Sequence, residues 1–137
     1  MFRWKDAYSV NIAEINKQHK ELFRIGGQIA DLVNANDDQD HFDEIMVILQ
    51  RLEEYTIYHF EYEEKLMEQY GYVETDSHKI EHLFLIKKLK KFENKDIDTE
   101  QKEAVVELVT FISDWIAGHI LKTDMKYKEF FNSRGLK

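Results

Sequence analysis

The chain has 137 residues, which suits one domain over residues 1–137, and 43% of them are hydrophobic, enough to fill one core. A formal net charge of −8 argues against a surface that binds nucleic acid or an anionic membrane. Cysteine and proline are absent, which excludes disulfides and thiolate metal sites and leaves helices without forced breaks.

The N-terminal residues are charged and contain no long apolar run, so no signal peptide is expected. We also expect no stretch to approach the roughly 18–20 apolar residues of a membrane span. These features favour a cytoplasmic monomer with no membrane partner. The one basic cluster is interleaved with apolar residues and is interpreted as the solvated face of a helix. Its members are Lys87, Lys88, Lys90 and Lys91.

Four segments place apolar residues at three- and four-residue steps, the spacing of an amphipathic helix. The predicted helices run from about Asn11 to Val33, from Asp40 to Gln69, from Asp76 or Ser77 to Phe92, and from Glu100 to Leu121. Gly71 follows the second helix and predicts a left-handed C-cap. Polar runs at 34–38 and 94–99 separate the helices, and Asp98 or Thr99 is expected to cap the fourth.

A short amphipathic tail, Met125 to Phe131, follows the fourth helix. Four helices with short links fold most simply as an all-α, antiparallel up-down-up-down four-helix bundle, here with a short C-terminal helical tail. Gly26 and Gly27 lie inside the first predicted helix, where each glycine costs about 1 kcal/mol relative to alanine. We interpret them as a point of close helix packing or a local end of the helix.

Five of the six histidines fall on the inward faces of the predicted helices. They are His19, His59, His78, His82 and His119. A buried polar group without a partner costs about 1–3 kcal/mol, so a core with five imidazoles is costly unless they bind something, and a metal would satisfy them directly. The sixth histidine, His41, lies beside an acidic loop and is interpreted as a solvated surface residue.

The spacing of these residues supports a metal site. His59 and Glu63 are four residues apart, as are His78 and His82, so each pair shares one face of a helix. The first and fourth helices each add one histidine, so all four helices contribute. A zinc site takes four ligands, and five imidazoles with carboxylates therefore fit two metal ions better than one.

Carboxylates can bridge two cations, and the candidates are Glu63 and Asp124. Asp124 lies five residues after His119, a spacing that does not return to the same face of an ideal α-helix. The fourth helix must therefore either end or contain a wider turn between Ile120 and Asp124, and a π-type bulge would suffice.

The motifs around these residues resemble the hemerythrin family over nearly the whole chain, from Trp4 to the terminal aromatic segment. They are Gln18-His19-Lys20, His59-Phe60-Glu61-Tyr62-Glu63, His78-Lys79-Ile80-Glu81-His82, and Trp115-Ile116-Ala117-Gly118-His119-Ile120 followed by Asp124. All seven ligand positions of the family hold the family's residue, in order and at the same spacing.

The resemblance implies a single hemerythrin-like diiron domain, with two iron ions (Fe²⁺/Fe³⁺) and an oxo or hydroxo bridge. It assigns His78, His82 and His119 to one iron, His19 and His59 to the other, and Glu63 and Asp124 to both. The first iron would then have six ligands, and the second would have five and one open position. Dioxygen would bind reversibly at that position, for storage, delivery or scavenging, and the protein would not be an enzyme.

The resemblance also implies an apolar pocket for dioxygen, although ordinary core packing would explain the same residues. The pocket positions match Leu22, Phe60, Trp115, Ile116 and Ile120. Tyr127 matches a position near a bridging carboxylate, where a hydrogen bond is expected. Gln18 and Glu64 are weaker candidates for hydrogen bonds to the ligands.

Other functions of the same site stay open. They are a diiron oxygen or redox sensor module and a diiron enzyme with peroxidase-like or nitric-oxide-handling activity. An electron-transfer partner would re-reduce the iron. Carboxylate-rich diiron enzymes fit less well, because no histidine here has a glutamate three residues before it.

Two further functional classes match parts of the sequence. The segment His78 to His82 also matches the pattern of inverted zinc proteases, with Glu81 as the general base, but that function leaves three histidines without a role. Glu81 is instead expected at the edge of the solvent-facing side of its helix. A metal-free interaction bundle is the remaining alternative.

Overall fold

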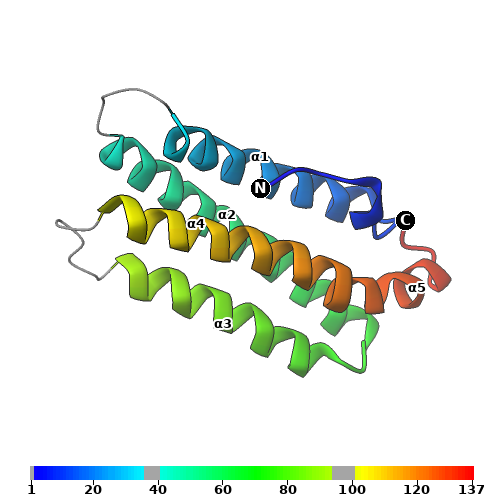
Figure 1. Ribbon diagram of the computed structural model, residues 1–137. Helices are drawn as coiled ribbons and strands as arrows, with labels where there is room; N and C mark the ends of the chain where they lie inside the picture. Colours follow the sequence, from blue (N-terminus) through cyan, green and yellow to red (C-terminus); the bar gives the residue numbers. More distant parts are fainter. Residues whose placement is uncertain (1, 36–40, 94–100) are drawn as a thin grey trace.

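The computed structural model describes residues 2–35, 41–93 and 101–137, and within them all regular structure is helical. The long helices are α1 (Ala13–Val33), α2 (Phe42–Tyr70), α3 (Thr75–Glu93) and α4 (Gln101–His119). Three short elements complete the chain: the 3₁₀ turn η1 (Asp6–Tyr8), the π-helical turn η2 (Ile120–Asp124) and the helix α5 (Met125–Ser133). Successive long helices run in opposite directions, which confirms the predicted antiparallel up-down-up-down bundle (Figure 1).

The helix boundaries differ from the predicted ones by one or two residues, and the backbone conformation explains the start of α1. α1 begins at Ala13 because Asn11 has a φ of 55°, in the left-handed region that ends a right-handed helix. Gly71, with a φ of 68°, forms the predicted left-handed C-cap of α2. The predicted starts at Asp40 and Glu100, and the caps Asp98 and Thr99, lie outside the described residues.

The prediction that Asp76 or Ser77 caps α3 is wrong, because the helix begins earlier, at Thr75. The turn before it already has helical hydrogen bonding. The backbone amide of Thr75 donates to the carbonyl of Tyr72 at 3.3 Å, and that of His78 donates to the carbonyl of Glu74 at 3.0 Å. Both predicted caps therefore lie inside the first turn.

The wider turn expected between Ile120 and Asp124 is present as the π-helical turn η2. The helix does not end there. The predicted C-terminal helical tail is α5, and α4, η2 and α5 follow one another without a break, so this tail continues the fourth helix (Figure 1). The extra residue in the π turn rotates Asp124 back to the face that carries His119.

The segment Glu103–Ser133 corrects the expectation that no stretch approaches a membrane span. It contains an 18-residue window with a mean hydropathy of 1.5, so its length and composition would allow it to cross a membrane. A core helix of a bundle has the same composition, and His119 and Asp124 in this segment are buried against the other helices.

Two apolar clusters fill the bundle along its length. The larger cluster includes Leu22, Phe60, Leu85 and Ile116, and the smaller one, at the end near α5, includes Met67 and Phe131. Along each part of the chain that forms a long helix, the inward histidines and carboxylates lie between residues of these two clusters. For α3 the smaller cluster contributes Tyr72, just before the helix, and for α4 it contributes Tyr127 and Phe131 of α5. Polar side chains are therefore concentrated in one layer with apolar side chains above and below it.

The two glycines of α1 differ in their surroundings. A Cβ atom on Gly26 would lie 2.3 Å from the ring of Phe2, whereas a Cβ on Gly27 would meet nothing within 4 Å. α1 continues through both glycines, so the interpretation as a local helix end is wrong. The close packing that requires Gly26 is with the N-terminal segment and not with another helix.

Replacing Gly26 by alanine should therefore destabilise the protein by about 1–3 kcal/mol, because the new methyl group overlaps the ring of Phe2. Gly27→Ala is the matched control. It should raise the free energy of unfolding by up to about 1 kcal/mol, since alanine is the better helix former and has room there. Urea unfolding of the two variants measures both effects, and equal stability of the two would contradict the packing described here.

Candidate metal centre

All seven residues predicted as metal ligands lie in the buried polar layer, and the most exposed of them, His119, has only 6% of its surface accessible. Each long helix contributes. α1 supplies His19, α2 supplies His59 and Glu63, α3 supplies His78 and His82, and α4 with η2 supplies His119 and Asp124. The predicted convergence of four helices on one site is thus present in the structure.

Asp124 lies at the centre of the layer. One carboxylate oxygen, Oδ1, lies 3.0 Å from Nε2 of His78 and 3.1 Å from Nε2 of His119. The other, Oδ2, lies 3.1 Å from Nε2 of His19. The two oxygens therefore face histidines on different sides, which is the arrangement that a bridging carboxylate needs.

Glu63 contacts histidines of two different helices through a single carboxylate oxygen. Its Oε1 lies 2.8 Å from Nε2 of His59 and 3.6 Å from Nε2 of His82. Its Oε2 accepts a hydrogen bond of 2.5 Å from the hydroxyl of Tyr127, which confirms the hydrogen bond predicted for that tyrosine. Tyr127 thus fixes the orientation of Glu63 from α5.

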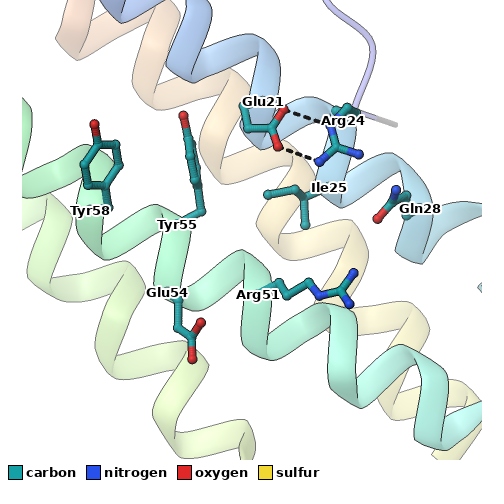
Figure 2. Close-up of a pocket in the computed structure, with 8 residues that line it drawn as sticks. All are labelled: Glu21, Arg24, Ile25, Gln28, Arg51, Glu54, Tyr55 and Tyr58. Atoms are coloured by element: carbon teal, nitrogen blue, oxygen red, sulfur yellow. Dashed lines mark hydrogen bonds and ion pairs between the residues drawn. The ribbon is translucent and has the colours of Figure 1, made fainter.

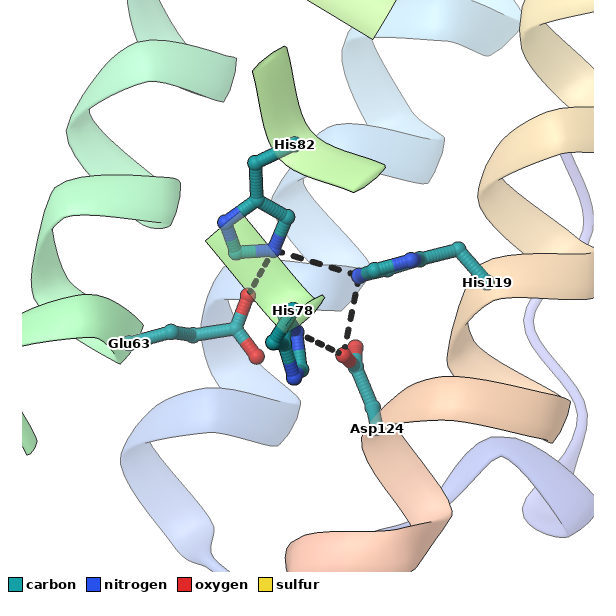
Figure 3. Close-up of side chains that lie close together, drawn as sticks. All are labelled: Glu63, His78, His82, His119 and Asp124. Atoms are coloured by element: carbon teal, nitrogen blue, oxygen red, sulfur yellow. Dashed lines mark hydrogen bonds and ion pairs between the residues drawn. The ribbon is translucent and has the colours of Figure 1, made fainter. Parts of the chain in front are cut away.

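These contacts divide the seven residues into two groups whose ligand atoms lie within 4.8 Å of one another. We call them the three-histidine group and the two-histidine group. The first contains Glu63, His78, His82, His119 and Asp124 (Figure 3), and the second contains His19, His59, Glu63 and Asp124. The division matches the one implied by the resemblance, and the two carboxylates belong to both groups.

In three of the imidazoles, the hydrogen-bond partner of the outer nitrogen, Nδ1, determines which ring nitrogen carries the hydrogen. Nδ1 of His82 lies 2.9 Å from a carboxylate oxygen of Glu64, and Nδ1 of His119 lies 3.4 Å from one of Glu81. Carboxylates only accept hydrogen bonds, so both Nδ1 atoms carry hydrogen. In neutral rings the two Nε2 atoms then hold lone pairs, and they lie 3.2 Å apart. Lone pairs this close repel unless a cation or proton lies beside them.

The same reasoning applies to His59. Its Nδ1 lies 2.7 Å from the amide oxygen of Gln18, whose amide nitrogen donates to Glu14 at 3.1 Å. The lone pair on Nε2 of His59 therefore faces the Glu63 carboxylate. The facing Nε2 and carboxylate atoms in this layer include several without any hydrogen-bond partner, among them both oxygens of Asp124. Such a convergence of lone pairs fits a cation in each group.

The ionisation of the buried groups supports the same conclusion. Burial raises the pKa of Glu63, but the neighbouring His59 and His82 lower it to about 2 overall. Burial also opposes the charge on Asp124, yet His119, His19 and His78 hold the pKa of that carboxyl well below its usual range. Two ionised carboxylates in a buried layer require positive charge beside them.

Protons supply part of that charge when no metal is bound. Burial lowers the pKa of His119, but the charge of Asp124 and a contact with it raise the pKa to about 9 overall. Burial lowers the pKa of His82, which keeps that ring neutral. A pKa of about 9 favours a proton on His119 at neutral pH when no metal is bound.

A small cavity adjoins the two-histidine group, and its lining includes every residue predicted for the dioxygen pocket. The centre of a water-sized molecule has about 10 Å³ in which to move there, which is room for about one such molecule. The lining residues are His19, Leu22, Thr56, His59, Phe60, Trp115, Ile116, His119, Ile120 and Asp124. Thr56, whose hydroxyl donates to the carbonyl of Leu52 at 2.6 Å, was not predicted.

Glu81 lies at the edge of the solvent-facing side as expected, with 45% of its side chain exposed. Its contacts were not predicted: it points at His119 and accepts a hydrogen bond of 2.8 Å from Thr123. Its place beside the fourth helix depends on the π turn, which brings Thr123 there. His41 lies outside both groups as predicted, but only 13% of its side chain is exposed, and its Nδ1 lies 3.1 Å from a carboxylate oxygen of Glu44.

A wider groove on the outer surface between α1 and α2 is a poorer candidate site (Figure 2). Its most ordered feature is the ion pair of Arg24 with Glu21, in which Nε of the arginine lies 2.8 Å from Oε2. The groove brings no cluster of metal ligands together. Its lining residues are Glu21, Arg24, Ile25, Gln28, Arg51, Glu54, Tyr55 and Tyr58.

Comparison with known proteins agrees with the geometry. The family described as the hemerythrin HHE cation binding domain matches residues 10–131. A bacteriohemerythrin of Clostridium acetobutylicum is 37% identical over 127 residues, which cover 93% of this chain and 98% of that protein. A bacteriohemerythrin of Pseudomonas aeruginosa is 32% identical over 125 residues, covering 90% and 77% of the two chains.

A hemerythrin-like protein of Naegleria gruberi is 29% identical over 128 residues, which cover 93% of this chain and 91% of that protein. The similarity therefore covers between 77% and 98% of each of these relatives, and the family match includes all seven residues of the buried layer. The chain belongs to the hemerythrin family and carries its cation-binding domain.

Proposed function

We propose that the site holds two iron ions and binds dioxygen reversibly. The observation that carries the proposal is that Glu63 and Asp124 belong to both groups of ligand atoms. Five imidazoles and two carboxylates exceed the four ligands of a zinc site, and two shared carboxylates suit two adjacent cations. The names of the bacterial relatives support a protein of the same kind.

The two groups differ in the number of ligands that they offer. The three-histidine group has five residues and the two-histidine group has four. An octahedral ion in the second group therefore has more coordination positions left for small molecules. The cavity adjoins this group and is lined by Leu22, Phe60 and Ile116, which supports an open coordination position on that side.

When bound, a pair of ferrous ions would supply an open coordination position and two electrons, which are returned when the gas is released. The protein keeps this exchange reversible by excluding water. Leu22, Phe60 and Ile120 are each no more than 5% exposed and give the cavity an apolar wall. Tyr127 holds Glu63 in place from the far side, so the carboxylate is not free to leave the layer.

The size of the cavity favours a binding protein over an enzyme that oxidises organic substrates. The centre of a water-sized molecule has only about 10 Å³ there, which suits one small molecule and leaves no room for a substrate with several carbon atoms. The ligands are also mainly imidazoles, whereas diiron enzymes of the ferritin-like group use mainly carboxylates. Both features favour storage, delivery or scavenging of dioxygen.

The direct test is the iron content and the absorption spectrum of the purified protein. We expect two irons per chain, a colourless reduced form, and visible absorption bands that appear with air and disappear when oxygen is removed. His59→Ala and His119→Ala should each lower the iron content, because each removes a ligand. His41→Ala is the control and should leave it unchanged. Unchanged iron in both ligand variants would contradict the proposal.

Metal loading should also depend on pH. A cation must displace the proton on His119, whose pKa of about 9 lies above the ordinary histidine value, so apparent affinity should rise with pH and level off above about 9. The same proton stabilises the metal-free fold fully below about pH 6.5, and that contribution disappears as the pH rises through about 9.

An indicator dye in weakly buffered solution measures this effect directly. Adding ferrous iron or cobalt(II) to the metal-free protein at neutral pH should acidify the solution. His119→Ala should release fewer protons for each ion bound. Metal affinity that is constant between about pH 6 and pH 9 would show that His119 carries no proton to displace.

A further inference from the structure

The outer contacts of the imidazoles differ between the two groups. In the three-histidine group, the Nδ1 atoms of His82 and His119 face the carboxylates of Glu64 and Glu81, at 2.9 Å and 3.4 Å. Both acids are partly exposed, with 27% and 45% of their side chains accessible. Each therefore keeps its charge in contact with water while it binds a buried ring.

The two-histidine group has no such carboxylate among the described residues. Nδ1 of His59 faces the neutral amide oxygen of Gln18 at 2.7 Å, and Nδ1 of His19 has no hydrogen-bond partner in the described part of the chain. The amide oxygen and nitrogen of Gln18 cannot change places, because the amide would then lose its hydrogen bond to Glu14. The negative outer contacts are thus confined to one group.

A carboxylate that accepts the Nδ1 hydrogen of an imidazole raises the electron density on the opposite nitrogen. It makes Nε2 a better donor to a cation and holds the ring in the required orientation. A neutral amide orients the ring but adds less charge. The contacts therefore strengthen the three-histidine group selectively, in addition to its larger number of ligands.

The π turn holds one of these acids in place. The hydroxyl of Thr123, in η2, lies 2.8 Å from Oε1 and 3.0 Å from Oε2 of Glu81. A half-exposed glutamate would otherwise be free to turn into solvent. Thr123 thus directs Glu81 toward His119, one residue before Asp124 enters the buried layer.

We propose that Glu64 and Glu81 are positioning residues that make the three-histidine group the tighter of two cation sites, and that Gln18 keeps the two-histidine group the weaker one. The inference rests on the two cation sites of the proposed function but not on dioxygen binding. It predicts an order of filling: the three-histidine group fills first and empties last.

Titration of the metal-free full-length chain with cobalt(II) against a competing chelator tests the order. We expect two binding steps. Glu64→Gln and Glu81→Gln should each weaken the tighter step by about 10-fold and leave the weaker step unchanged. Gln18→Glu should strengthen the weaker step by a similar factor, a gain that a merely structural role would not produce. Ligand variants assign the steps: His19→Ala should remove the weaker one and His78→Ala the tighter one.

Two controls separate a directed hydrogen bond from a general loss of charge. Glu61→Gln removes an exposed acid from α2 that forms no hydrogen bond or ion pair with an imidazole in the described part of the chain, and it should change neither step. Thr123→Val keeps the charge of Glu81 but removes the hydroxyl that orients it, so this variant should weaken the tighter step. Thr123→Ser keeps the hydroxyl and should leave the tighter step as strong as in the unaltered protein.

The outcomes separate the two claims. A single cobalt ion per chain would overturn the pair of cation sites and this inference with it. Two steps that both respond equally to Glu81→Gln, or a tighter step that is removed by His19→Ala, would overturn the inference alone. Circular dichroism of each metal-free variant shows whether the fold is kept. If a variant that should lose affinity does not fold, the gain of affinity expected for Gln18→Glu decides the question.

Discussion

The structure depends on the burial of two carboxylates. Glu63 and Asp124 have no exposed surface, and ionised groups in that position cost several kcal/mol each unless positive charge lies beside them. In the metal-free chain a proton on His119 supplies part of this charge. Two cations would supply it more fully, because they also satisfy the lone pairs of the histidines. The apolar clusters on either side keep water from competing for these groups.

The geometry of the fourth helix follows from the same requirement. An ideal α-helix with His119 directed inward would turn Asp124 away, and the π turn η2 corrects this by one residue. The turn also places Thr123 against Glu81 and brings Tyr127 to Glu63. One local change in helical pitch therefore positions a shared carboxylate and the hydrogen bonds on both sides of it.

Most of the fold and the ligand layer could be predicted from the sequence because they depend on periodicity. Histidines at four-residue spacing on an apolar face have one plausible arrangement, and the five-residue spacing to Asp124 requires a wider turn. The outer contacts depend on geometry that spacing does not fix. Glu81 reaches His119 only through the packing of α3 on η2, and Gly26 is required by Phe2, which is distant in the sequence.

The central claim is that two cations lie side by side in this layer and share Glu63 and Asp124. Anomalous X-ray diffraction from crystals of the iron-loaded protein, measured on both sides of the iron absorption edge, tests it most directly. Two peaks should appear, one bounded by His78, His82 and His119 and the other by His19 and His59. One peak, or a peak that touches only one carboxylate, would contradict the account.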